Sequence, residues 1–309
     1  MNISNNYSLG LTQSKLDFVD VRLERDNKLF VDPRLIELSK KPIVAKMQNQ
    51  LKIFLAELLD QIKANNERNV KYLLSGLGEP KETRLGHSDE SFDGNSVGDK
   101  LKPKFQSAIS DSVLLKYGVL NNLGDFDLFI DDIGCDRISD ITTKIIKSVL
   151  IEYTQQQCEN SLVPIPMTEV HQKYLFDINT LRWTERKVKL PVYLGKPVIF
   201  VPKDIVRRKN DANSNLGSFY RYAIRNFIAT DEELIKDIVG TGKDNIVLLR
   251  DVKLAYPSSK ASSQKWLIRF PKLLVDFKSN LLNPKLRPLT DEEIEAIIYD
   301  SDLSEFKAS

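Results

Sequence analysis

The amino-acid sequence predicts an α+β or α/β fold, with a central mixed β-sheet flanked by helices and a mainly helical C-terminal third. Three observations lead to this fold class. Apolar residues recur every three or four positions between Pro42 and Leu74. Short β-like segments lie near 126–130, 187–190 and 197–201, and helix-start motifs stand in the last third of the chain.

Composition narrows the class of protein. The chain has 309 residues and a near-neutral net charge of +2, so no global field attracts nucleic acid or an anionic membrane. Its two cysteines cannot form a disulfide framework. The longest apolar runs have about five residues, far fewer than the ~20 that a membrane span needs. We therefore expect a soluble cytoplasmic protein with no membrane partner, whose oligomeric state stays open.

The first third of the chain combines short strands with a long helix. Residues 16–23 alternate apolar and polar side chains, and 28–31 can form a second short strand. The apolar stripe predicts a helix over 42–75. A polar, glycine-rich loop follows at 76–98, and helical spacing resumes over 99–117.

The middle of the chain alternates strand and helix signals. Residues 126–130 are predicted as a strand, and Ser139 or Asp140 is expected to cap a helix over 141–158. The polar stretch 209–217 marks a soft boundary, which divides the chain into an α/β core over 1–208 and a helical region over 209–309. Capping boxes at Thr230–Glu233 and Thr290–Glu293 introduce helices in that second region.

An acidic cluster is the strongest candidate for chemistry. It consists of Asp125, Asp127, Asp131, Asp132, Asp136 and Asp140. Mg²⁺ prefers oxygen ligands and takes one or two protein carboxylates, which a strand, turn and helix can bring together. One alternative is structural, with Asp140 as a helix N-cap and Asp131 and Asp132 as solvated edge residues. Another is a polar binding surface.

Further carboxylates and a lysine complete the predicted site. Glu79 and Glu82 precede the glycine-rich loop and are predicted as additional metal ligands beside Asp136 and Asp140. Lys203 follows the apolar segment 197–201 and is predicted to orient a water molecule or to stabilise charge. Glu82, Asp136, Asp140 and Lys203 form the predicted catalytic set. Glu185 and Lys187 also have Glu-x-Lys spacing, a pattern that chance often produces.

A basic stretch is the best local candidate for binding nucleic acid. It contains Arg207, Arg208, Lys209, Arg221 and Arg225. These side chains can contact phosphates, and the four-residue spacing of the last two places them on one face of a helix. The alternative is a solvated basic face over a partly buried aromatic cluster.

Three pieces of the sequence carry a resemblance to known proteins: Leu29–Pro33, Glu79–Gly86 and Asp136–Thr142. Together they resemble a family of uncharacterised bacterial proteins associated with mobile-element or phage-defence gene clusters, over residues 16–230. The carboxylates and lysines are also similar to those of restriction-type nucleases, although the Pro-Asp and Asp/Glu-x-Lys pattern of those enzymes is missing.

Two functions are therefore expected. The first is a Mg²⁺-dependent nuclease that cleaves foreign DNA or RNA in bacterial defence. The second is a non-catalytic binding or regulatory subunit, whose partner is a protein such as an ATPase or helicase and whose contact segment is the loop at 76–98.

Overall fold

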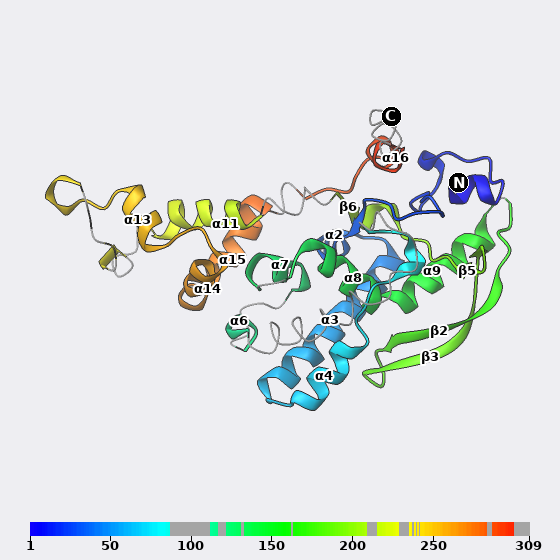
Figure 1. The fold of residues 1–309 in the computed structure, drawn as a ribbon, viewed down its shortest axis with the longest axis horizontal. Helices are drawn as coiled ribbons and strands as arrows, with labels where there is room; N and C mark the ends of the chain where they lie inside the picture. Colours follow the sequence, from blue (N-terminus) through cyan, green and yellow to red (C-terminus); the bar gives the residue numbers. More distant parts are fainter. Residues whose placement is uncertain are drawn as a thin grey trace.

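Helices and short antiparallel strand pairs make up the computed structural model, which confirms the α+β class (Figure 1). The N-terminal two thirds of the described chain form a core of helices and strands, and a helical arm projects from this core. The described residues are 1–86, 112–116, 122–130, 133–161, 163–208, 215–228, 235–236, 238, 240, 242–282 and 286–299.

The core helices differ from the prediction mainly at their ends. The expected helix over 42–75 is two helices, α3 (Pro42–Lys63) and α4 (Glu67–Ser75), because Asn65 has a left-handed φ of 53°. The apolar stripe of α3 is buried as predicted. Shorter helices accompany them: α1 (Ile3–Asn6), α2 (Pro33–Leu38) and α6 (Val113–Lys116), the described part of the helix predicted over 99–117.

Two helices carry the C-terminal half of the core. The helix predicted over 141–158 begins earlier and is divided, giving α8 (Cys135–Ile145) and α9 (Lys147–Asn160). Gly134 is the N-cap of α8, so the expectation that Ser139 or Asp140 caps this helix is wrong. Ser139 lies inside the helix, where its Oγ accepts a hydrogen bond from Val31 N (2.9 Å).

The strands form antiparallel pairs in place of one central mixed sheet within the described residues. They are β1 (Phe30–Val31) with β6 (Val206–Arg207), β2 (Thr168–Asp177) with β3 (Arg182–Leu190), and β4 (Val192–Tyr193) with β5 (Lys196–Pro197). The predicted strand at 187–190 is the end of β3. Residues 16–23 are irregular apart from single bridges, and the strand predicted at 126–130 is helix α7 (Phe126–Phe129).

The apolar segment 198–201 runs through the core without joining a sheet. All four of its side chains are at most 2% exposed. Its polar backbone groups are satisfied one at a time by different elements. The bonds run from Ile199 N to Glu82 O (2.9 Å), from Phe200 N to Thr154 Oγ1 (2.9 Å) and from Val19 N to Val201 O (2.9 Å). Burial thus explains the apolar run, while its hydrogen bonds come from loops and one side chain.

Turns of 3₁₀ and π-helix join these elements. The 3₁₀ turns are η1 (Gln13–Lys15), η2 (Lys81–Thr83), η3 (Leu123–Asp125), η4 (Lys203–Ile205) and η6 (Lys243–Asn245). The π-helical turns are η5 (Ile224–Ile228) and η7 (Lys278–Leu282). No helix in the described part of the chain is both long and apolar enough to cross a membrane.

The arm consists of α11 (Asn215–Ala223), α13 (Leu249–Ala255), α14 (Lys260–Arg269) and α15 (Lys272–Phe277), with α13 at the end away from the core (Figure 1). Aromatic contacts inside it join Phe219 to Phe277 and Tyr220 to Trp266. At its base, Lys278 pairs with the buried Asp125 (3.0 Å). Asp125 is therefore an anchor of the arm in this structure.

The last described helix, α16 (Asp291–Tyr299), lies near the N-terminus of the chain (Figure 1). Its capping box is confirmed, because Glu293 N donates to Thr290 Oγ1 (3.2 Å) and Thr290 N donates to Glu293 Oε2 (2.8 Å). The capping box predicted at 230–233 lies outside the described residues. Ile294 and Ile298 are buried, and Asn2 Nδ2 donates to Tyr299 Oη (3.1 Å).

The hydrogen bond from Phe200 N to Thr154 Oγ1 yields a test of the core. Thr154→Val keeps the side-chain volume but leaves the buried amide of Phe200 unsatisfied, which we expect to cost about 1–3 kcal/mol in the free energy of unfolding. Thr154→Ser keeps the acceptor and loses only a methyl group, so urea denaturation should find it more stable than the valine variant. The opposite order, which packing alone favours, would contradict this account of the segment.

Candidate functional site

Four carboxylates from three separate segments lie within electrostatic range of one another. Asp136 and Asp140 lie one turn apart on α8, Glu79 follows α4, and Asp26 lies in the turn before β1. The negative charges of Asp26, Glu79 and Asp136 each act on the carboxyl group of Asp140, which shows that they lie near it. We call these residues the carboxylate cluster. It includes three of the four predicted metal ligands.

Asp140 is the most perturbed member of the carboxylate cluster. Burial raises the pKa of its carboxyl group to about 8, with further contributions from the negative charges of Glu79, Asp136 and Asp26. The charge of Lys144, one helical turn further along α8, acts in the opposite direction but is outweighed. At neutral pH the Asp140 carboxyl is therefore largely protonated, because a further negative charge is unfavourable there.

Two buried lysines, Lys144 and Lys147, act on the charge of Glu82. Lys147, at the start of α9, has a side chain only 3% exposed, and its Nζ is 2.5 Å from Glu82 Oε1. Burial acts to raise the pKa of Glu82, but the charges of Lys147 and Lys144 outweigh it and lower that pKa overall. Glu82 is thus an ionised carboxylate held by cations. Lys144 connects it electrostatically to Asp140.

Arg84 links Glu82 to Asp26 from the opposite direction. Its guanidinium is buried, which lowers its pKa, while the charges of Asp26 and Glu82 oppose that shift. Its backbone has a left-handed φ of 57°, and its carbonyl accepts hydrogen bonds from Asn27 N and Nδ2 (both 2.8 Å). These bonds hold the turn at Asp26 against the segment 84–86. The site therefore alternates acidic and basic side chains.

The arrangement can attract a cation, although it does not already form a closed metal site. Within the described residues, no group of three or more His, Cys, Asp or Glu side chains is arranged so that it could hold a metal ion. The mutual repulsion around Asp140 is nevertheless the electrostatic condition that a bound divalent cation relieves. The prediction of Mg²⁺ at Glu79, Glu82, Asp136 and Asp140 stays a prediction.

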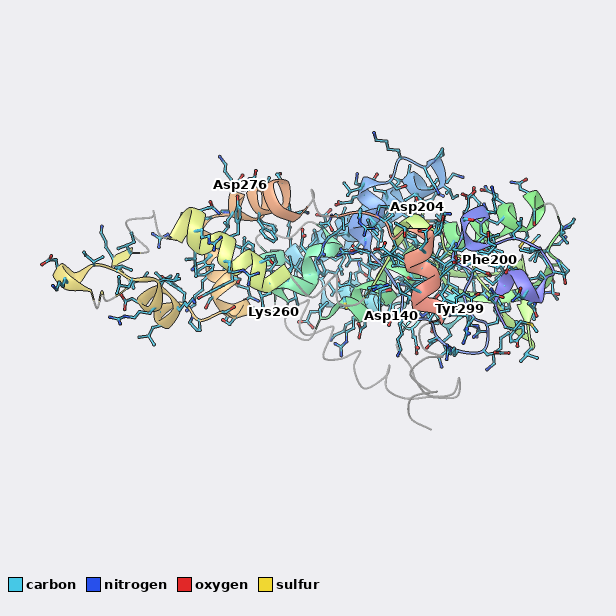
Figure 2. All side chains as sticks on the ribbon, turned by 90° about the horizontal axis from the view of Figure 1, so that it is seen from above. Asp140, Phe200, Asp204, Lys260, Asp276 and Tyr299 are labelled. Carbon is cyan, nitrogen blue, oxygen red and sulfur yellow. The ribbon has the colours of Figure 1, made fainter. Side chains whose placement is uncertain are left out.

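Lys203 lies in a different environment from the other predicted catalytic residues. Its Nζ pairs with Asp291 Oδ1 of α16 (2.7 Å), and none of the described contacts joins it to the carboxylate cluster. Asp204, its neighbour in sequence, and Asp140 are well apart in Figure 2. Lys187 pairs with Glu169 across the β2–β3 hairpin (2.9 Å). Of the lysines in the described chain, Lys144 and Lys147 are the ones placed beside Glu82.

The predicted nucleic-acid contacts separate into two groups. Arg207 donates to Asp32 Oδ2 (2.7 Å) in a pair whose side chains are only 11% and 9% exposed, so this guanidinium has a structural role. Arg208 is exposed, as are Arg221 on α11 and Arg225 in η5. Lys209 lies outside the described residues, as do Asp131, Asp132 and residues 87–98 of the glycine-rich loop.

A groove of about 1230 Å³ is hollowed into the described surface. It lies between α3, α9 and the β2–β3 hairpin, and it does not include the carboxylate cluster. Its walls carry both signs of charge, including the pairs Lys46–Glu152 and Lys187–Glu169. This balance favours no particular ligand.

Several residues of the site were not predicted from the sequence. Lys144 follows Asp140 by four positions on one helix, a local spacing that could have identified it. Lys147 could not be identified in this way, because its partner Glu82 lies 65 residues earlier. Asp26 and Arg84 meet only through the pairing of two loops, for which the sequence carries no periodic signal.

Comparison with known proteins finds one family. Residues 8–213 match a family described as a domain of unknown function, DUF8370. The comparison finds no curated protein and no solved structure that matches the chain. The family match covers the whole charged site and ends before the arm.

The raised pKa of Asp140 predicts how stability depends on pH. Between about pH 4 and pH 8 the folded protein binds a proton that the unfolded chain releases, so stability falls as the pH rises through this window. Asp140→Asn mimics the protonated form. In EDTA, we expect it to match the wild type near pH 4 and to exceed it by several kcal/mol above pH 8, since each unit of pKa shift corresponds to about 1.4 kcal/mol. Parallel pH profiles from chemical denaturation would contradict this assignment.

Proposed function

The chain belongs to the DUF8370 family, and for this member we propose a divalent-cation-dependent nuclease that hydrolyses phosphodiester bonds in DNA or RNA. The observation that supports this proposal is that the charges of Glu79, Asp136 and Lys144 all act on the Asp140 carboxyl group. These residues come from two segments more than 50 positions apart in the sequence. Carboxylates next to a cation are the groups that metal-assisted phosphodiester hydrolysis requires.

The residues of the carboxylate cluster fit Mg²⁺ by their chemistry. All their donor atoms are carboxylate oxygens, which are the ligands that hard divalent cations prefer. Glu79, Asp136 and Asp140 would hold the ion, and Asp140 would lose its proton on binding it. When bound, Mg²⁺ supplies an activated water molecule and neutralises charge on the phosphate.

The protein's own cations have a separate part in this proposal. Lys144 lies between Asp140 and Glu82, so its charge can stabilise negative charge that develops on a phosphate beside Asp140. We assign to Lys144 the role that the sequence suggested for Lys203, because Lys203 pairs with Asp291. Glu82 keeps the two lysines in place through its pair with Lys147.

The proposal extends to the biological substrate, which we take to be foreign nucleic acid. The resemblance of Leu29–Pro33, Glu79–Gly86 and Asp136–Thr142 to proteins of mobile-element and phage-defence clusters supports foreign nucleic acid as the target. Two of these three pieces contain residues of the charged site. The family match itself says nothing about defence or about restriction-type nucleases.

A second function is favoured by a different observation. Glu82 and Lys203, two of the four predicted catalytic residues, are already engaged in ion pairs. Such pairing is typical of structural groups, and it favours a non-catalytic subunit whose partner is a protein such as an ATPase or helicase. Cleavage by the purified chain decides between the two functions.

The nuclease proposal predicts metal-dependent cleavage by the purified chain. Plasmid, linear DNA and RNA should be cut with Mg²⁺ or Mn²⁺ and not with EDTA. Glu79→Gln and Asp140→Asn should each slow cleavage by at least about tenfold, because each removes a negative charge from the metal site. The matched control is Asp60→Asn, on the exposed face of α3, which should leave the rate unchanged.

Metal binding can be measured separately from cleavage. At pH 7, Mg²⁺ should raise the melting temperature of the wild type and of Asp60→Asn, but not that of Asp140→Asn. A folded wild type that neither cuts nucleic acid nor responds to Mg²⁺ would exclude the nuclease and leave the non-catalytic subunit.

A further inference from the structure

The arm carries a charge that the chain as a whole does not. Residues 242–282 contain eight Lys or Arg against three Asp and no Glu, which gives this segment a net charge of +5. The complete chain has a net charge of only +2, so the other residues sum to −3. Over the whole arm, residues 215–282, eleven Lys or Arg stand against seven Asp or Glu, which gives a net charge of +4. The arm therefore carries more net positive charge than the chain as a whole.

Most of this positive charge faces solvent. Six of the eight basic residues in 242–282 are exposed: Lys243, Arg250, Lys253, Lys265, Arg269 and Lys272. Among the three acidic residues, Asp251 is buried and Asp276 is half-buried, which leaves Asp244 as the one exposed carboxylate in this described segment. The exposed side chains of this segment thus keep the net charge of +5 that the sequence count gives.

The other two basic residues of this segment, Lys260 and Lys278, hold the arm against the core. Lys278 pairs with Asp125, and Lys260 Nζ donates to the carbonyl oxygen of Ile130 (2.5 Å). Both contacts lie at the base of the arm, where it meets the core. Figure 2 shows Lys260 near that base, with the rest of the arm extending away from it. The exposed cations are therefore not needed to hold the arm to the core.

The exposed cations lie on helices that are fixed from within. Lys265 and Arg269 are four positions apart on α14, so they share a face, while Trp266 and Leu267 of the same helix are buried. Lys253 lies on α13 and Lys272 begins α15. On α11 and η5, Arg221 and Arg225 add two exposed cations to the same arm.

We propose that the arm binds the sugar–phosphate backbone of a nucleic acid and holds it independently of base sequence. This inference rests on the proposed function, because it names the surface that retains the substrate. Exposed cations along a projecting element match a linear polyanion, and phosphate contacts by lysine position a strand without reading bases. The arm lies outside the family match, so this binding belongs to the appended segment.

An anionic membrane and a stacked single strand are the alternative anionic partners. An anionic membrane would engage apolar side chains as well as cations, and the arm exposes Ile246, Leu248, Leu249, Leu254, Ile268 and Val275. The vesicle measurement below therefore tests this partner directly. Base stacking on a single strand would require exposed aromatic rings, whereas Phe219, Trp266 and Phe277 are buried in the arm. Contacts to phosphate therefore dominate the expected affinity.

The test measures binding of the full chain in EDTA, where no cleavage can occur. The probes are fluorescent duplex DNA, single-stranded DNA and single-stranded RNA, each of about 20 nucleotides per strand and mixed sequence, titrated between about 50 and 200 mM salt. The arm variant is Lys253→Gln, Lys265→Gln and Lys272→Gln combined. For duplex DNA we expect at least about a tenfold loss of affinity and a salt slope smaller by about 2–3.

The matched control removes the same charge from the core through Lys52→Gln, Lys63→Gln and Lys173→Gln, all exposed lysines. It should change affinity less than about twofold. Equal losses in both variants would overturn the proposal, as would a wild type that binds none of the three probes. Capture by vesicles of phosphatidylcholine and phosphatidylglycerol, without nucleic-acid binding, would also overturn it.

The same variants separate this inference from the proposed nuclease. Asp140→Asn should bind nucleic acid like the wild type in EDTA, because Asp140 lies on the core and not on the arm. Arm-dependent binding without any Mg²⁺-dependent cutting would leave the arm proposal standing and exclude the nuclease. Cutting that the arm variant performs at wild-type affinity and rate would overturn the arm proposal alone.

Discussion

Glu82 joins the hydrophobic core to the charged site, and both depend on it. Its carboxylate holds the buried Lys147, while its backbone carbonyl accepts the hydrogen bond from Ile199 N in the central apolar segment. A buried lysine without a partner would destabilise the fold by several kcal/mol, and an unsatisfied core amide adds about 1–3 kcal/mol. Glu82 therefore supplies both a counter-charge for the buried Lys147 and an acceptor for the buried amide of Ile199. In this way it fixes α9 and the segment 198–201 relative to each other.

The parts of the fold that could be predicted are those with local periodicity. The stripe of α3, the end of β3 and the capping box of α16 each rest on spacings within one element. The central sheet could not be inferred correctly, because the apolar run at 198–201 looks like a strand whether its partners are strands or loops. Likewise, residues 126–130 are apolar and short, so burial and strand formation predict the same pattern.

The same distinction between local and long-range patterns separates the site residues that could be predicted from those that could not. Asp136 and Asp140 were recognisable because they belong to a run of six aspartates between residues 125 and 140, and Glu79 because it adjoins a distinctive loop. Lys203 was chosen for its place after an apolar segment, but its partner Asp291 is 88 residues away in the sequence. The alternation of charges around Glu82 depends on Asp26, Arg84 and Lys147, which meet only after the loops have packed. Long-range pairing of charges leaves no signature in a single sequence.

The arm leaves the core after β6 and the chain returns to the core at α16, so both of its ends are tied to one body. Topologically, such a segment is one long connection between two points of the core, and the core contacts do not depend on its length. The entropic cost of closing a longer loop grows only slowly with length, by about 0.6 kcal/mol for each doubling. A change in the length of the arm should therefore affect the core and its charged site little, because both attachment points stay in place.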